Sequence, residues 1–213
     1  LFNNLKGYPK ARFASNLFTR DDRLCQMFDA PNITEFKKRI QAGFKKPIPP
    51  RVVTEAPVQE VVIDKEINVW DLVPMISHTV KDSGRTLGGG ISCVVGEYFQ
   101  GGSHIGFNRM SFLPDRKDFS TFQIAPGAHM WQIATRYYGS NHIPLTMCLG
   151  LPPAAYMVAG SGFNYMTLPE GSDEIGLAGA IQGSPIDIVK ARTVDAWAMA
   201  NCQFVLEGYV EPG

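Results

Sequence analysis

The sequence lacks net charge, long apolar runs and paired cysteines. Its 20 Lys and Arg residues balance 20 Asp and Glu residues, which argues against electrostatic binding of nucleic acid or of a membrane surface. No run of about 18 apolar residues predicts a transmembrane helix. Cys25, Cys93, Cys148 and Cys202 form no C-x-x-C pair, so zinc-ribbon and thioredoxin-like motifs are unsupported. The apolar neighbours of the last three cysteines predict buried free thiols in a reducing cytoplasm.

Several common catalytic motifs are also missing. The sequence has no G-x-S-x-G elbow, no Walker A loop and no dinucleotide-binding G-x-G-x-x-G, which argues against an α/β-hydrolase, a P-loop enzyme and a Rossmann enzyme. Residues 1–7 carry no secretory signal. What is present is a 45% hydrophobic composition over 213 residues, enough for one large domain or for a small and a medium one.

The first fifty residues predict helix and loop. Asn32 precedes a capped short helix over residues 32–40, with Gly43 near its end. The basic, proline-rich segment 45–51 is the best candidate for a boundary between an N-terminal part and the rest of the chain.

Beyond the connector, short strands outnumber helices. The pattern predicts strands at 58–63, 90–96, 103–112, 119–124, 143–149, 186–190 and 203–210. It predicts helices at 127–138, 152–159 and 173–180. Because no regular βαβ rhythm appears, the sequence favours an α+β fold around a β-barrel or meander over a doubly wound sheet.

The segment 101–110 is the first candidate for chemistry. Gly101 and Gly102 open a predicted strand that carries His104 and Arg109, a possible metal ligand and a cation suited to carboxylate or phosphate. The alternative is a hairpin with a surface arginine and an internally paired histidine. Strict alternation would place the two side chains on opposite faces, so a shared site requires a bulge or bend, which Gly106 could permit.

Two further segments carry metal-ligating side chains. His129 lies where a loop enters a helix, and it could ligate a metal or simply pack or cap that helix. Asp173 and Glu174 lie in the first turn of the helix at 173–180, where they could complement the helix dipole or turn one carboxylate inward as a ligand. Two histidines and one carboxylate would suit a divalent ion bound to a phosphate. His78 and His142 have weaker contexts and are interpreted as structural or surface residues.

Taken in order along the chain, these segments resemble the UbiD family of decarboxylases, which use prenylated FMN. The matching stretches are Leu1-Phe2-Asn3-Asn4-Leu5-Lys6-Gly7-Tyr8-Pro9, 57–62, 71–74, His104-Ile105-Gly106-Phe107-Asn108-Arg109, Pro126-Gly127-Ala128-His129, 143–145, 149–154, 173–180 and 204–210. Each match is short, and it is the ordered set that is specific.

The resemblance implies roles for individual residues. Arg109 matches the arginine beside the reacting carboxylate, where it would be catalytic. His129 and Glu174 match two ligands of the divalent metal that holds the cofactor phosphate, and His104 stands where the family usually has Asn. The resemblance thus implies a metal site of His104, His129 and Glu174 for Mn²⁺, with K⁺ as a further candidate ion. The implied cofactor-binding residues are His104, Phe107, Asn108, Arg109, Gln123, Ile124, Ala125, Ala128, His129 and Glu174.

The resemblance also implies an architecture and an activity. Residues 57–213 would form a split β-barrel that binds prenylated FMN, preceded by part of a small N-terminal α/β segment over 1–56. The chain would be a fragment that lacks both ends of the usual family chain, including a C-terminal oligomerisation domain and the acidic catalytic pair. The full-length protein would decarboxylate an aromatic, heteroaromatic or α,β-unsaturated acid reversibly and without oxidation, with the cofactor as electron sink.

The resemblance further implies a cytoplasmic homo-oligomer, a dimer or a hexamer, supplied with cofactor by a flavin prenyltransferase. Nucleic acid and membrane are not expected partners. Two alternatives stay open: a flavin-binding module without decarboxylase activity, and an assembly subunit of a decarboxylase complex.

Overall fold

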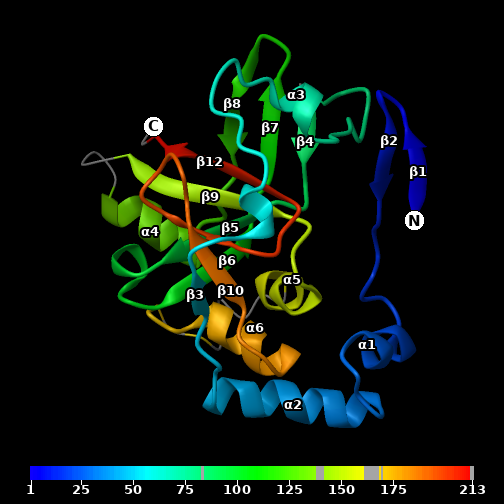
Figure 1. Cartoon of the computed structure of the whole chain (residues 1–213), viewed down its shortest axis with the longest axis vertical. Helices are drawn as coiled ribbons and strands as arrows, with labels where there is room; N and C mark the ends of the chain where they lie inside the picture. Colours follow the sequence, from blue (N-terminus) through cyan, green and yellow to red (C-terminus); the bar gives the residue numbers. More distant parts are fainter. Residues whose placement is uncertain (83, 138–141, 161–167, 169, 212–213) are drawn as a thin grey trace.

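The computed structural model describes residues 1–82, 84–137, 142–160, 168 and 170–211. A four-stranded sheet lies at its centre, with a three-stranded sheet and a β-hairpin towards one end and the long helix α2 at the other (Figure 1). None of the described helices is long and apolar enough to cross a membrane.

The helices are α1 Asp21–Met27, α2 Ile33–Lys45, α3 Val69–Leu72, α4 His129–Tyr137, α5 Pro153–Gly160 and α6 Glu174–Gln182, with short 3-10 turns η1 Pro57–Gln59 and η2 Glu97–Phe99. The strands are β1 Phe2–Leu5, β2 Tyr8–Phe13, β3 Arg51–Val53, β4 Arg85–Leu87, β5 Ile91–Val95, β6 Ser103–Phe107, β7 Met110–Leu113, β8 Arg116–Phe122, β9 Ile143–Leu149, β10 Asp187–Lys190, β11 Trp197–Met199 and β12 Phe204–Val210.

The central sheet has the antiparallel order β12-β9-β5-β6, so β6 lies at its edge. Alternate residues of β5 face different layers. Ile91 and Cys93 join the core that α5 and α6 form, whereas Val94 joins the core that includes Met130 and Ile133 of α4. Because both faces are covered, β5 and β9 are apolar and buried along almost their whole length.

Gly43 of α2 faces α6, and Gly179 of α6 faces the segment that follows α2, so both close approaches depend on a glycine. A Cβ on Gly43 would lie 3.1 Å from the Cβ of Ala180, and one on Gly179 would lie 2.7 Å from the carbonyl oxygen of Ile48. Asn32 caps α2 by accepting from the amide of Glu35. The predicted helix at 32–40 is therefore confirmed, and it runs on to Lys45. Gly43 lies near its end, as predicted, and is also a packing position.

Most predicted elements of the C-terminal part are present. The predicted strands at 90–96, 119–124, 143–149, 186–190 and 203–210 correspond to β5, β8, β9, β10 and β12, and the three predicted helices correspond to α4, α5 and α6. The predicted end of the first helix, residue 138, lies outside the described residues. Cys93, Cys148 and Cys202 are buried free thiols, as predicted, and Cys25 is half-buried.

Two predictions for the first third of the chain were wrong. Residues 2–13 form the β1–β2 hairpin rather than helix or loop, with Gly7 at φ 87° in the turn; its strands are largely exposed, so no buried apolar face marks them. Residues 58–63 are not a strand. Pro57 opens the turn η1, and Val61, Val62 and Ile63 are exposed, because this apolar run finds no partner strand among the described residues.

The predicted strand at 103–112 is divided between two sheets. β6 pairs with β5, whereas β7 pairs with β4 and β8 in a separate three-stranded sheet. The fold is thus α+β, as predicted, and the sheets in the described part of the chain do not close into a barrel through strand pairing.

Gly102 tests how tightly the edge strand is held. A Cβ at this position would lie 2.2 Å from the carbonyl oxygen of Gly171, which is backbone and cannot move aside cheaply. We expect Gly102→Ala to lower the free energy of unfolding by about 1–3 kcal/mol or more, measured by urea denaturation. Gly89→Ala is the matched control, because nothing lies within 4 Å of its added Cβ. Equal unfolding midpoints for the two variants would contradict this packing.

Candidate functional site

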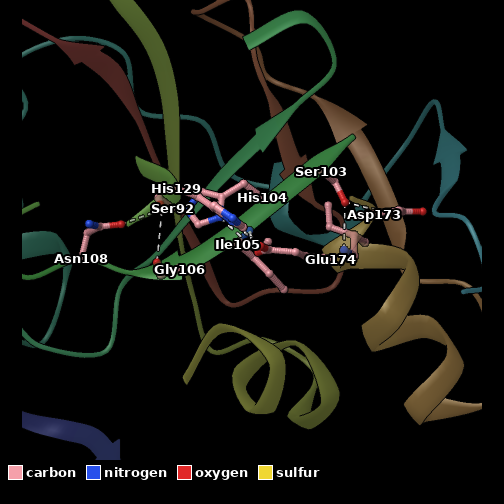
Figure 2. Close-up of polar contacts among 10 residues, drawn as sticks. Ser92, Ser103, His104, Ile105, Gly106, Asn108, His129, Asp173 and Glu174 are labelled. Carbon is pink, nitrogen blue, oxygen red and sulfur yellow. Dashed lines mark hydrogen bonds and ion pairs between the residues drawn. The ribbon is translucent and has the colours of Figure 1, made fainter. Parts of the chain in front are cut away.

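Three ionisable side chains from separate elements meet inside the protein. His104 lies on β6, His129 begins α4 and Glu174 begins α6. Nδ1 of His104 lies 3.1 Å from Oε2 of Glu174, and Nδ1 of His129 lies 2.8 Å from Oε1. The three residues are 1%, 2% and 0% exposed. Figure 2 shows their side chains converging beside β6.

Packing against Phe99 and the space beside Gly106 fix the positions of the two imidazoles. The ring of the buried Phe99 lies 5.5 Å from His104 and 4.9 Å from His129, between ring centres, and the two imidazoles meet edge to face. Gly106, two residues along the strand from His104, provides the space for its ring, since a Cβ there would lie 3.0 Å from Cε1 and Nε2. β6 pairs with β5 in regular register through Gly106, so this glycine introduces no bulge. The chain changes sheets after Phe107 instead.

Glu174 provides a hydrogen-bond acceptor for the edge strand of the central sheet. Its Oε2 accepts from the outward amide of Ile105 at 2.8 Å, and the amide of Ser103 donates to the carbonyl of Ser172. Burial alone would raise the pKa of Glu174, but hydrogen bonds from His104 and His129, the charge of His104 and the Ile105 amide outweigh it, so its pKa is lowered. The carboxylate is thus stabilised as an anion within the protein.

Asp173 has a different role from its neighbour. Its side chain caps α6 by accepting from the amide of Gly176 at 2.7 Å, and Ser103 Oγ donates to the same oxygen at 2.5 Å. Ser103 Oγ also accepts from the amide of Ile175 at 2.9 Å. This network fixes the start of α6 against β6, so Glu174, and not Asp173, turns inward.

The cluster has the donors that a divalent metal needs. One ligand atom from each residue can be chosen so that all lie within 4.8 Å of one another. Nε2 of His104 is buried without a hydrogen-bond partner among the described residues. The three residues could therefore hold a metal ion.

Arg109 and its neighbours are the second group of predicted site residues. Arg109 is exposed, and no described contact joins it to the histidine–glutamate cluster. Its carbonyl accepts from the amide of Gln123, which brings together two segments predicted to bind cofactor. Phe107 is 43% exposed and stacks on Tyr156. Ile124, Ala125 and Ala128 continue from Gln123 to the start of α4, and they are half-buried or exposed.

Asn108 is buried, and its side chain is used inside the protein. Its Oδ1 accepts from Ser92 Oγ at 2.7 Å, and its Nδ2 donates to the carbonyl of Gln123 at 2.9 Å. From the turn between β6 and β7, the side chain thus binds β5 and the segment after β8, and Figure 2 shows its contact with Ser92. Sequence reasoning missed Ser92 and Ser103. The pattern Asp173-x-x-Gly176 before a helix could have indicated a cap, but Ser92 sits in an apolar strand with no such signal.

His78 and His142 are exposed, in agreement with their interpretation as surface residues.

Comparison with known proteins decides the family. A family profile described as "3-octaprenyl-4-hydroxybenzoate carboxy-lyase Rift-related domain" of UbiD matches residues 51–213. The chain belongs to the UbiD family. It is 30% identical, over 221 residues, to the gallate decarboxylase of Lactiplantibacillus plantarum, covering 100% of this chain and 44% of that protein.

Solved UbiD-class structures share the fold. The apo 3,4-dihydroxybenzoic acid decarboxylase of Klebsiella pneumoniae has a TM-score of 0.83 at 26% identity, covering 100% of this chain and 44% of that one. An evolved dimeric form of the UbiD-class enzyme HmfF from Pelotomaculum thermopropionicum, in complex with prFMN, has a TM-score of 0.78 at 23% identity, covering 89% and 43%. The chain thus spans a little under half the length of these UbiD relatives.

Ser103 tests the support of this UbiD site. We expect Ser103→Ala to cost about 1–3 kcal/mol of stability, because the buried amide of Ile175 loses its acceptor and Asp173 loses a donor. Urea denaturation measures the effect, with Ser15→Ala at an exposed serine as the control. A Ser103→Ala variant as stable as the control would show that this hydroxyl does not hold α6 in place.

Proposed function

We propose that the protein containing this chain is a carboxy-lyase that decarboxylates an aromatic, heteroaromatic or α,β-unsaturated acid, reversibly and without oxidation, using prenylated FMN and a divalent metal. The observation that carries the proposal is the buried cluster of His104, His129 and Glu174 in a chain of the UbiD family. The aromatic acid decarboxylases among its relatives support the substrate class.

In this proposal the cluster binds and does not react. His104, His129 and Glu174 hold Mn²⁺, with K⁺ as a further candidate ion, and the metal anchors the phosphate of the flavin. When bound, the flavin supplies the electron sink that loss of CO₂ from an sp² carbon requires. The prFMN in the complex with HmfF supports the choice of cofactor.

Arg109 orients the substrate. Its exposed guanidinium would pair with the substrate carboxylate, for which its planar fork provides two parallel hydrogen bonds. The Ser92–Asn108–Gln123 contacts fix the backbone that carries Arg109. On the same proposal the cofactor is lined by Phe107, Gln123, Ile124, Ala125 and Ala128. Residues 57–213 form the split barrel, and residues 1–56 form a separate N-terminal segment.

The proposal extends to the cellular setting. A flavin prenyltransferase supplies the cofactor, and the full-length protein is a cytoplasmic homo-oligomer. The free thiols of Cys93, Cys148 and Cys202 support a reducing compartment.

The direct test is the absorption spectrum and metal content of the full-length protein, purified with and without a co-expressed flavin prenyltransferase, followed by a CO₂-release screen of aromatic acids. Bound flavin, bound metal and CO₂ release are the expected result. Bound flavin without CO₂ release from any acid would favour the flavin-binding module instead. A colourless protein in both preparations would refute the cofactor assignment.

Arg109→Ala tests the assigned catalytic residue. We expect kcat/KM for CO₂ release to fall by about 100-fold or more, the scale of losing one well-placed charge-stabilising group, while flavin absorbance is retained. Arg116→Ala, on the neighbouring β8 where the guanidinium stacks on Phe119, is the matched control and should keep full activity. Full activity in the Arg109 variant would remove Arg109 from the mechanism.

A further inference from the structure

The buried cluster offers a bound ion more imidazole than carboxylate side chains. In the described part of the chain the cluster offers two imidazoles and a single carboxylate. The carboxylate already accepts the amide of Ile105 on Oε2, which leaves Oε1 as its less occupied oxygen. A bound ion would therefore meet at least as many nitrogen donors as oxygen donors from this chain.

His104 is placed to act as one of these donors and not merely to fill space. The cluster is closed around it by Phe99, by His129 and by the backbone of Gly106, so its ring has little room to turn. In this fixed orientation Nδ1 faces Glu174, and Nε2 is buried without a hydrogen-bond partner among the described residues, so one ring nitrogen contacts the carboxylate while the other is available to an ion. A side chain already held in the binding geometry loses little conformational entropy when it coordinates an ion.

Resting on the proposed function, we propose that His104 sets the metal preference of this site. With His104 as a nitrogen ligand, the site favours later divalent transition metals such as Co²⁺, Ni²⁺ and Zn²⁺ over Mn²⁺ and Mg²⁺ more strongly than a site with an oxygen donor at that position. The physical reason is that imidazole suits the later metals, whereas carboxylate, carbonyl and water suit Mg²⁺ and Mn²⁺.

The test compares metal preference with and without the imidazole. Full-length protein is freed of metal by chelation and loaded with Mn²⁺, and Co²⁺ is titrated in while the electron paramagnetic resonance signal of released aqueous Mn²⁺ is recorded. We expect the preference for Co²⁺ over Mn²⁺ to fall by about tenfold or more in His104→Asn, the lower end of what changes around a metal cost. His142→Asn, which alters an exposed histidine, should behave like wild type.

A second measurement needs no variant. Pulsed electron paramagnetic resonance of the Mn²⁺-loaded wild-type protein counts the coordinated imidazole nitrogens. Two are expected, from His104 and His129. A single nitrogen would overturn the inference even if the His104→Asn protein failed to fold.

The outcomes separate this inference from the proposed function. An unchanged preference in a folded His104→Asn protein would overturn the inference, while the metal site itself would stand. Failure of the wild-type protein to bind either Mn²⁺ or Co²⁺ would overturn the inference and the metal part of the proposed function together. The flavin spectrum and CO₂ release would then decide the remaining part of the function.

Discussion

The site and much of the fold depend on the hydrogen bonds to one buried carboxylate, that of Glu174. A carboxylate without partners would be very costly to bury. Glu174 has three hydrogen-bond donors among the described residues: the amide of Ile105 and the imidazoles of His104 and His129. These donors come from β6 and α4, whereas the carboxylate comes from α6. One charge therefore ties together three elements that are distant in sequence.

Glu174 both completes the hydrogen bonds at the edge of the central sheet and belongs to the candidate metal site. Edge strands leave outward amides without partners, and β6 solves this by directing them to Ser172 and Glu174. Ser103 and Asp173 fix the start of α6 in the position that this pairing needs. Changes to the candidate ligands thus act on the sheet edge as well, and stability has to be measured beside any functional readout.

The break between β6 and β7 separates two tasks of the site. Before it, His104 and the amide of Ile105 face the buried cluster. After it, Arg109 is exposed, and its carbonyl binds the amide of Gln123. The Ser92–Asn108–Gln123 hydrogen bonds hold the chain where it passes from one sheet to the other. In the proposed UbiD-type enzyme this arrangement keeps the metal-binding groups away from water while the carboxylate-binding group remains accessible to substrate.

The sequence by itself determined the elements whose signals are local. The Asn32 cap, the apolar strands β5 and β9 and the helix at 173–180 follow from capping chemistry and hydrophobic pattern, and His104, His129 and Glu174 could be named as candidate ligands, whose metal binding remains a prediction. Tertiary structure alone decided the division of 103–112 between two sheets, the loss of the strand at 58–63 and the contacts that bury the carboxylate of Glu174. The physical reason is that strand pairing and carboxylate burial depend on partners far along the chain, which no local pattern contains.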